Sequence, residues 1–465
     1  MKELINRLTE GKRVAILGYG REGRSSYNLI RNLFPEKLLG IIDNNEEISK
    51  DPDLSSDPKA ILHLGSGCMK QLLNYDLVIK APGISFHVLP EGFDKSRITS
   101  QTSLFLQEYG KQVIGVTGTK GKSTTSSLIH HILSCSGFHS ILLGNIGLPP
   151  FEGIPEITEA TLIVMELSSH QLEFLSKSPH IALLLNIFQE HLDHYVNYEA
   201  YQQAKMNIGK FQDKNDFFIY SSDNKLLDKL VEESEPLQHI LLPYSLHPLS
   251  SDGIFRTENA VWMKREGSIK KLFDVSPSLS LPGEHNFSNI MAAVTACHIA
   301  GVSPEKMRKA ISSFKGLEHR IEFVGEYDGI QYFNDSIATI PEATIEAVKT
   351  LQKVGTLILG GYDRGIDYHI LYPFLVHSGI DNLIFIGEAG KRMKSELLTS
   401  GIQAGQAIYE AGNYEEVVEI AKRVTVKGKI CLLSPAASSF DMFKNFEHRG
   451  EIYKKNVRSN ATSHP

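Results

Sequence analysis

Cysteine is scarce in this chain of 465 residues, and its four cysteines are scattered along it. No two of them form a CxxC pair, which argues against both a disulfide framework and a zinc site. The first residues, MKELINRLTEGKRV, lack the apolar core of a secretion signal. We therefore expect a protein of the reducing cytoplasm. The four cysteines are Cys68, Cys135, Cys297 and Cys431.

Long apolar runs, basic stripes and internal repeats are also missing. The longest apolar run, 181–188, is too short to span a bilayer and contains Asn186. The net charge is −6, and no stripe of lysine and arginine indicates a nucleic acid. We therefore expect neither a membrane nor a nucleic acid as a partner. The length is that of about three domains of ordinary size.

What the sequence has instead is a phosphate loop, VIGVTGTKGKSTTSSL, at 113–128. An apolar strand leads into glycines and a helix opens at Lys122, so that free backbone N–H groups and the positive end of the helix dipole face an anion. Lys122 would reach the terminal phosphates, and the Ser123 hydroxyl would ligate Mg²⁺. The common G-x₄-GKS spacing does not fit, because position 116 is valine. We expect a nucleoside triphosphate to bind along Gly118, Thr119, Lys120, Gly121, Lys122, Ser123 and Thr124.

A second glycine loop, GYGREG at 18–23, lies in the first expected domain, residues 1–110. It follows a predicted strand at 13–17, and Asp43 comes twenty positions after its last glycine, at the end of another strand. This matches the dinucleotide fingerprint, in which glycines allow close phosphate approach and a carboxylate binds a ribose hydroxyl. The same geometry holds a nucleoside diphosphate, so a nicotinamide or flavin enzyme remains an alternative. The candidate residues, including a later strand-end turn, are Gly18, Gly20, Gly23, Asp43, Pro82 and Gly83.

The second expected domain, residues 111–316, collects polar residues after apolar strands. Glu166 follows a strand at 162–165, and Asn186 follows one at 181–185. Ligands of open α/β sheets bind at this edge. Glu166 can hold Mg²⁺ as an oxygen ligand, or it can simply charge the start of the next helix. Taken alone, His191 and Lys205 are ordinary surface residues. The stretch 217–281 is β-like and rich in turns, and it suggests no chemistry.

The third expected domain, residues 317–465, alternates apolar strands with polar loops and helices. This pattern is typical of a parallel α/β unit. A helix is predicted at 341–353, and the tail after Tyr453 is expected to be loosely ordered. The sequence thus predicts an α/β protein of three domains. The four predicted strands of this third domain are 331–333, 356–359, 383–386 and 430–433.

Taken together and in their order, the motifs of this chain resemble the Mur ligase family of bacterial cell-wall synthesis. They match best its branch that adds glutamate, and they span nearly the whole sequence. The matching segments are TGTKGKST (117–124), GNIG (144–147), ELSSHQLE (166–173), Asn186 with HLDHY (191–195), YQQAK (201–205), GEHNFSN (283–289), HR (319–320), NDS (334–336) and SPAASSFDMFKNFEHRG (434–450).

The resemblance implies an enzyme that joins glutamate, normally D-glutamate, to UDP-N-acetylmuramoyl-L-alanine in peptidoglycan precursor synthesis. ATP would phosphorylate the substrate carboxylate, and the glutamate amine would attack the acyl phosphate. The resemblance also implies a Rossmann-like UDP-binding domain, a central P-loop ATPase-like domain with a parallel sheet, and a Rossmann-like carboxyl-terminal domain that closes over ATP. These small molecules would be its partners, and a monomer is expected.

The resemblance further implies roles for individual residues. The catalytic residues would be Lys122, Lys205 and His191. The ligands of Mg²⁺ would be Ser123, Glu166, His191 and Lys205, the last as a carbamate formed with CO₂. Besides the phosphate loop, ATP would contact Asn286, Asn289, Arg320 and Asp335. The UDP-linked substrate would contact Gly18, Gly20, Gly23, Asp43, Pro82, Gly83, Asn145 and His191. Glutamate would contact Thr339, Arg364, Ser439 and Phe446.

Two departures from the family pattern concern the amino-acid pocket. Ile337 stands where the D-glutamate branch has lysine in its DSKAT motif, and Arg364 stands where that branch usually has another lysine. One cation is lost and another changes from a point charge to a planar fork. These changes leave L-glutamate open as the acceptor. The motifs are also compatible with a dinucleotide-dependent oxidoreductase, a relative of folylpolyglutamate synthetase or a regulatory P-loop switch.

Overall fold

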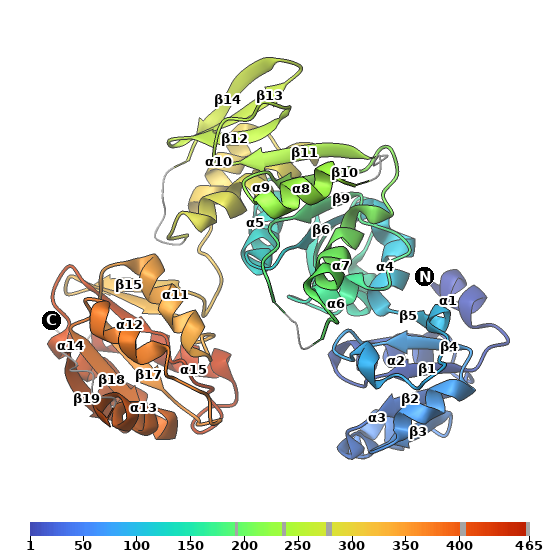
Figure 1. Ribbon diagram of the computed structural model, residues 1–465, viewed down its shortest axis with the longest axis horizontal. Coiled ribbons are helices and arrows are strands. Elements are labelled where there is room, and N and C mark those ends of the chain that lie inside the picture. The colour runs from blue at the N-terminus through green and yellow to red at the C-terminus, as the bar shows by residue number, and fades with distance from the viewer. Residues whose placement is uncertain (191–193, 235–238, 276–280, 400–405, 462–465) are drawn as a thin grey trace. The chain divides into compact units, whose positions relative to one another are not determined.

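The computed structural model describes residues 1–190, 194–234, 239–275, 281–399 and 406–461. Within these ranges the strands form three sheets of five, nine and six strands (Figure 1). The chain divides into two compact units, Met1–Val275 with Phe287–Ser312, and Ser276–Asn286 with Ser313–Pro465. The first unit contains the first two sheets, and the second unit contains the third. The domain boundaries near residues 110 and 316 stay predictions.

The first sheet has the strand order β3-β2-β1-β4-β5, and all of its strand pairs are parallel. β1 (Val14–Leu17) and β4 (Leu77–Lys80) are buried at every residue, as expected for parallel strands that are covered on both faces. The glycine loop at 18–23 joins β1 to the following helix. The remaining elements are α1 (Lys2–Thr9), α2 (Arg21–Leu33), β2 (Leu39–Asp43), α3 (Pro52–Ser55), β3 (Ala60–Leu64), β5 (Ile98–Thr99) and α4 (Gln101–Tyr109).

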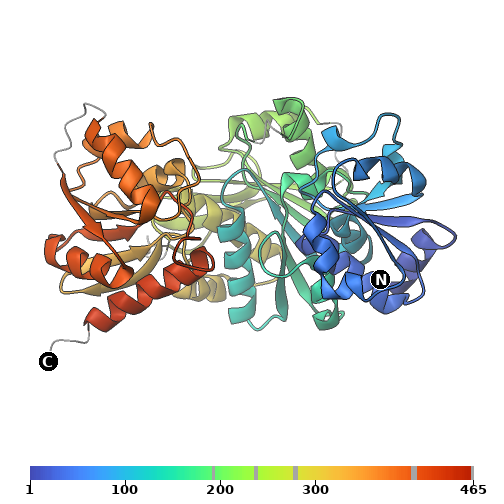
Figure 2. The same ribbon diagram turned by 90° about the horizontal axis from the view of Figure 1, so that it is seen from below.

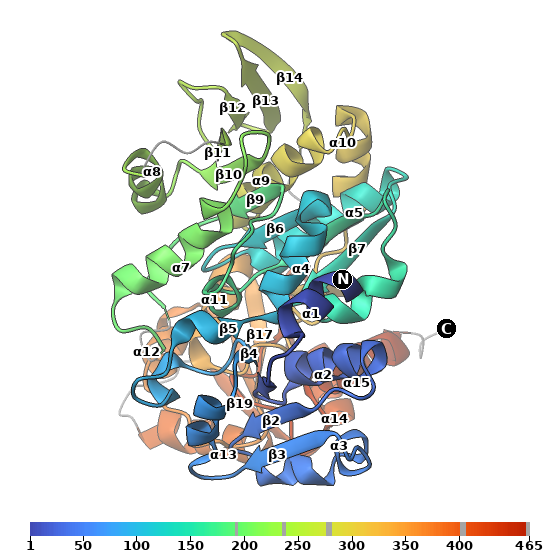
Figure 3. The ribbon, with the colours of Figure 1, turned by 90° about the vertical axis from the view of Figure 1, so that its right-hand side faces the viewer.

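The central sheet has the order β14-β13-β12-β11-β10-β9-β6-β8-β7. Its strands are parallel from β7 to β12, whereas β12, β13 and β14 pair as antiparallel hairpins. These hairpins continue the sheet beyond β11, at the top of the view in Figure 3. The elements are β6 (Val113–Thr117), α5 (Lys122–Cys135), β7 (Ser140–Gly144), β8 (Leu162–Glu166), α6 (Ser169–Leu172), β9 (Ile181–Leu184), α7 (Tyr198–Lys210), β10 (Phe217–Ser221), α8 (Lys225–Glu232), β11 (Ile240–Ser245), β12 (Gly253–Thr257), β13 (Ala260–Arg265), β14 (Ser268–Asp274), α9 (His285–Ile299) and α10 (Pro304–Ser313).

The third sheet has the order β15-β16-β20-β17-β18-β19 and is parallel except for the edge strand β15. Helices cover both of its faces (Figure 2). Its central strands β17 and β20 are buried throughout. The elements are β15 (Glu322–Tyr327), β16 (Ile330–Asn334), α11 (Pro341–Leu351), β17 (Val354–Gly360), α12 (Leu371–His377), β18 (Asn382–Ile386), α13 (Gly387–Thr399), β19 (Ala407–Ala411), α14 (Tyr414–Val424), β20 (Ile430–Leu433) and α15 (Phe446–Ala461).

The α/β fold class predicted from the sequence is confirmed, and the predicted strands lie where the structure has β1, β2, β4, β6, β8, β9, β16, β17, β18 and β20. The prediction of a loosely ordered tail after Tyr453 is wrong. α15 continues to Ala461, because Tyr453 and Val457 lie four residues apart on one face and are both buried. The β-like stretch 217–281 extends the central sheet. Among the described residues, no helix is long and apolar enough to cross a membrane.

Candidate active site

The phosphate loop joins β6 to α5, and two of its glycines are required by the structure. Gly121 caps α5 with a φ of +85°, and a Cβ atom there would lie 2.4 Å from Oδ1 of Asn289. Gly118 has a φ of +158°, and its Cβ would lie 2.9 Å from Cβ of Leu185. The glycines therefore allow a close approach of the backbone to neighbouring groups. Ser123 and Thr124 follow, half-buried, in the first turn of α5.

Two lysines converge on one carbonyl oxygen of this loop. Lys122 Nζ donates to the carbonyl of Gly118 at 2.8 Å and to that of Thr119 at 3.0 Å. Lys205, from α7, donates to the same Gly118 oxygen at 2.9 Å and is only 2% exposed. Burial, and then the neighbouring charge of Lys122, lower the pKa of Lys205 well below its usual value. The structure thus brings together two predicted catalytic residues, and the buried one favours its neutral amine.

The loop is tied to the segment after β9 and to α7. The backbone N–H of Thr119 donates to the carbonyl of Asn186 at 3.0 Å, and that of Lys120 donates to Oδ1 of Asn186 at 2.8 Å. The Thr119 hydroxyl is bonded to that of Tyr201 at 2.9 Å. Lys120 forms an ion pair with Glu190. The predicted role of Asn186 as a strand-end residue of the site therefore has a structural basis, since it shapes the loop backbone.

Glu166 ends β8, next to the phosphate-loop strand, and its side chain is buried with 1% exposure. Its Oε1 accepts a hydrogen bond of 2.7 Å from the amide of Asn145, which belongs to the GNIG loop. Its Oε2 is buried and finds no hydrogen-bond partner among the described residues. A buried carboxylate oxygen without a donor is costly unless a cation takes it. Glu166 therefore fits a magnesium ligand, and it lies beside a residue predicted to bind substrate.

The glycine loop of the first domain is shaped by Asp43. The carboxylate accepts the backbone N–H of Tyr19 at 2.7 Å and that of Asn45 at 2.8 Å. A Cβ at Gly23 would lie 1.9 Å from the carbonyl oxygen of Gly18, which itself has a φ of +86°. Gly20 has open space around its Cβ position, so that a ligand can come close to the backbone there. Asp43, which was predicted to bind the substrate, thus also fixes the loop backbone through its hydrogen bond to Tyr19.

The turn that contains Pro82 and Gly83 lies beside this loop. β4 pairs with β1, and the N–H of Ala81 donates to the carbonyl of Leu17 at 2.8 Å. Both turns therefore open at the carboxyl edge of the first sheet, as expected for a nucleotide site in this fold. The GNIG loop of the central domain reaches the same region, since Arg21 donates to the carbonyl of Gly147.

The two asparagines predicted for the adenine side lie three positions apart near the start of α9. Side chains at this spacing share one face of a helix. Asn289 accepts a hydrogen bond of 3.2 Å from the Thr125 hydroxyl of α5, and Asn286 donates to the carbonyl of Pro282 at 2.7 Å. Both are buried, at 6% and 8% exposure. Asn289 thus belongs to the phosphate-loop neighbourhood.

In the third domain, Asp335 follows β16 and is 4% exposed. Its carboxylate accepts the Ser434 hydroxyl at 2.8 Å and the backbone N–H of Ile321 at 3.1 Å. Burial raises the pKa of Asp335 to about 7, because these bonds stabilise the charged form only in part. Arg320, which precedes Ile321, is exposed. The structure therefore places the two residues predicted to reach ATP from this domain on adjoining segments.

The residues predicted to bind glutamate gather on neighbouring loops of the third domain. Arg364 is exposed, and its guanidinium lies 3.4 Å from the carbonyl of Thr339. Ser439 is buried, whereas Phe446 is half-buried and begins α15. The hydroxyl of Ser336 donates to the carbonyl of Phe446 at 2.8 Å, which joins the NDS segment to the start of this helix.

Arg449 is a residue of this region for which the sequence predicted no role. It is 1% exposed and donates to four groups: the hydroxyl and the carbonyl of Ser336, and the carbonyls of Ala437 and Ser438. It thereby joins the two loops that carry the predicted ATP and glutamate residues. Burial lowers its pKa. The sequence feature that could have indicated a role for Arg449 is its place within the SPAASSFDMFKNFEHRG segment. His191, predicted as a metal ligand, lies outside the described residues.

Comparisons with known proteins cover nearly the whole chain. Residues 116–297 match the family described as Mur ligase middle domain, and residues 319–437 match the family described as Mur ligase, glutamate ligase domain. The chain is 33% identical over 457 residues to the UDP-N-acetylmuramoylalanine–D-glutamate ligase of Koribacter versatilis, covering 97% of this chain and 98% of that protein. The chain belongs to the Mur ligase family. It is similarly 33% identical to the ligase of the same name from Ruminiclostridium cellulolyticum, covering 98% of both chains.

The fold of this Mur ligase also agrees with solved structures. It aligns with a MurF ligase from Thermotoga maritima, solved in complex with ADP, at a TM-score of 0.56 and 16% identity, covering 99% of this chain and 100% of that one. The likeness extends to the whole three-domain architecture. The family predicted from the sequence is therefore confirmed, and the chain is an ATP-dependent ligase. This membership decides against an oxidoreductase and against a P-loop switch.

Proposed function

We propose that this Mur ligase joins D-glutamate to UDP-N-acetylmuramoyl-L-alanine at the expense of ATP, in peptidoglycan precursor synthesis. The observation that carries the proposal is the full-length similarity to relatives named for this reaction. The buried carboxylate and the two converging lysines supply a site of suitable chemistry for it. Lys122 would exchange its bonds to the carbonyls of Gly118 and Thr119 for bonds to phosphoryl oxygens.

In this proposal the chain works mainly by positioning and by neutralising charge. Glu166 and Ser123 would hold Mg²⁺, which supplies charge stabilisation at the transferring phosphoryl group. The backbone N–H groups at the start of α5 would bind the phosphates. Asn145, held by its bond to Glu166, would orient the muramoyl substrate so that its free carboxylate meets the phosphoryl group. The acyl phosphate would then be attacked by the amine of glutamate.

We also propose that Lys205 is carbamylated. Its neutral amine would attack CO₂, forming an N–C bond and releasing one proton to solvent. The resulting carbamate is an anion that faces Lys122, so that the two groups attract each other, whereas two ammonium groups would repel each other. The geometry that supports this is the shared Gly118 oxygen and the 2% exposure of Lys205.

The reaction is tested by following phosphate release with ATP, UDP-N-acetylmuramoyl-L-alanine and each enantiomer of glutamate. We expect turnover with D-glutamate and none when glutamate is omitted. Turnover with L-glutamate alone would overturn the assignment of the acceptor. The L-glutamate arm is included because Ile337 and Arg364 replace lysines in the amino-acid pocket.

The carbamate is tested with Lys205→Ala and with Lys205→Glu, which restores an anion. We expect the alanine variant to lose at least about a hundredfold in kcat and the glutamate variant to recover part of it. Lys210→Ala is the matched control, because Lys210 is exposed on the same helix. An independent readout is the NMR signal of isotopically labelled bicarbonate on the enzyme. Full activity of Lys205→Ala, or no labelled carbamate, would refute the modification.

We further infer that the enzyme acts as a monomer in the cytoplasm. The described cysteines are all free thiols, which suits a reducing compartment. Sedimentation of the purified enzyme with and without ATP tests the first inference, and cell fractionation tests the second.

A further inference from the structure

The loop at 317–321 holds Arg320 between two residues with left-handed backbones. His319 has a φ of +62° and Ile321 a φ of +44°. Residues other than glycine rarely adopt this region; histidine adopts it more often than most, whereas a β-branched residue such as Ile321 is an outlier there. Such a backbone persists only where its surroundings determine it. The contacts around this loop therefore decide how Arg320 is presented.

Glu322 makes central contacts to this loop. Its Oε2 accepts hydrogen bonds from the backbone N–H of His319 and from the side-chain amide of Asn334, both at 2.9 Å. Its Oε1 lies 3.0 Å from Nζ of Lys454, which comes from α15. The two side chains are 13% and 4% exposed. Solvent therefore screens this pair much less than a surface ion pair.

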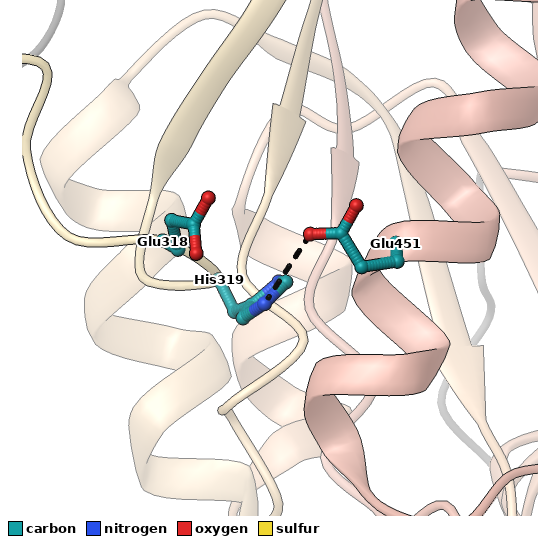
Figure 4. Close-up of side chains that lie close together, drawn as sticks. All are labelled: Glu318, His319 and Glu451. Carbon is teal, nitrogen blue, oxygen red and sulfur yellow. Dashed lines mark ion pairs between the residues drawn. The ribbon is translucent and has the colours of Figure 1, made fainter.

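Lys454 also lies beside a cluster of three side chains that has the composition of a metal site, shown in Figure 4 without the lysine. Ligand atoms of Glu318, His319 and Glu451 lie within 4.8 Å of one another. Nζ of Lys454 lies 2.7 Å from Glu451 and 3.6 Å from Glu318, so an ammonium group already lies among these carboxylates. Asn334 donates to Nδ1 of His319 at 3.0 Å. The cluster is a charge network that surrounds the loop.

α15 lies directly against the loop at Gly450. A Cβ at this position would be 2.2 Å from Nδ1 of His319 and 2.9 Å from the amide nitrogen of Asn334. The helix backbone therefore contacts the His319 ring, and Lys454, one turn further along the helix, reaches Glu322. α15 begins with Phe446, which is predicted to contact the substrate glutamate. The same helix thus also fixes the Arg320 loop.

We propose that Glu322 and Lys454 are a positioning pair that fixes the 317–321 loop and thereby presents Arg320 to the nucleotide. Neither is a catalytic residue, because each acts through the loop. The inference rests on the proposed function and on the expectation, implied by the resemblance, that Arg320 contacts ATP. It goes beyond that function by assigning the orientation of Arg320 to a buried ion pair between β15 and α15.

The first test replaces each member of the pair. We expect Glu322→Gln and Lys454→Met to raise the KM for ATP about tenfold, while the KM for the UDP-linked substrate stays unchanged. Lys454→Arg keeps the ion pair and should recover most of the affinity. The matched control is Lys429→Met, which removes a 2.6 Å ion pair with Asp381 in the same unit and should leave both KM values unchanged. An equal rise of both KM values would overturn the proposal.

The second test is a double-mutant cycle with Arg320→Ala. If Glu322 acts through Arg320, then Glu322→Gln should cause no further loss of ATP affinity once Arg320 is gone. Additive losses would overturn the proposal. The Lys454→Met cycle gives the same answer if Glu322→Gln does not fold, and a circular dichroism spectrum identifies such a case.

The same cycle can be measured without turnover, by titrating a fluorescent ATP analogue into the full chain. This separates the positioning pair from the proposed function. A wild-type enzyme that binds the analogue but shows no glutamate-dependent phosphate release contradicts the proposed function, while the binding cycle still decides the positioning pair. An active wild-type enzyme with additive losses contradicts the positioning pair alone.

Discussion

Replacing Asp335 by asparagine would remove the ionisation of a buried carboxyl without changing its shape. Burial raises the pKa of Asp335 from 3.8 to about 7. Asparagine can still accept the N–H of Ile321 through its amide oxygen. The Ser434 hydroxyl, which is also bonded to Thr344 at 3.1 Å, can rotate to accept the new amide N–H. The variant therefore isolates the charge.

The sign of the effect follows from linkage. Because folding raises the pKa of Asp335, the folded state binds the proton more tightly than the unfolded state does. The group therefore contributes stability below pH 3.8, and this contribution is lost as the pH rises to the folded pKa of about 7. At about 1.4 kcal/mol per pH unit, Asp335 contributes about 4 kcal/mol to the free energy of unfolding at low pH. About 2 kcal/mol of this contribution is lost between about pH 5.5 and about pH 8.

Hydrogen exchange of β16 and β20 in the nucleotide-free enzyme measures this change, because it gives opening free energies for the strands that flank Asp335. We expect the wild-type value to fall by about 2 kcal/mol over this range, and that of Asp335→Asn to stay level. Asp363→Asn is a control, because bonding to Arg392 lowers the pKa of Asp363, so that this group stays ionised over the whole range and its substitution should leave the pH dependence unchanged. Parallel curves for the wild type and Asp335→Asn would refute the reasoning.

Two further substitutions test the packing of the site. Gly121→Ala and Gly137→Ala share the cost of a positive φ, about 1–2 kcal/mol, but only the first brings a Cβ to within 2.4 Å of Asn289. Steady-state kinetics should therefore give a KM for ATP about tenfold higher in Gly121→Ala than in Gly137→Ala, and equal values would contradict the steric argument. Arg449→Lys cannot replace four hydrogen bonds and should lower the opening free energy of the third domain by about 3 kcal/mol in hydrogen exchange; an unchanged value would contradict the role of Arg449.

The loops proposed to bind phosphate were predictable because glycine spacing is a local signal. Gly23 and Gly121 leave no room for a side chain, so the backbone geometry is written into the residue type itself. Glu166 and Asn186 were predictable because apolar strands end just before them, and the carboxyl edge of a parallel sheet collects such residues. Hydrophobic periodicity and glycine spacing were sufficient to predict these loops and these strand-end residues.

The contacts between distant segments were not predictable in the same way. Arg449 donates to residues 11 to 113 positions away, and its burial depends on how two loops meet. Lys454 looks like a solvated residue of a polar tail, yet its ion pair with Glu322 joins segments 132 positions apart. The polar composition after Tyr453 concealed a helix, because two buried residues one turn apart suffice to dock it. Only the fold supplies these partners.

Lys122 and Lys205 donate to the same carbonyl oxygen, and this contact links the proposed binding of a triphosphate by Lys122 to the proposed carbamylation of Lys205. Two ammonium groups on one carbonyl oxygen would repel each other, and burial, followed by the charge of Lys122, lowers the pKa of Lys205. A triphosphate would draw Lys122 away from this oxygen, whereas a carbamate on Lys205 would attract Lys122 and Mg²⁺ alike. Each event removes part of the same repulsion, so the one that comes first leaves less for the other to gain, and linkage makes this coupling reciprocal. The carbonyl of Gly118 thus brings both lysines into one electrostatic unit.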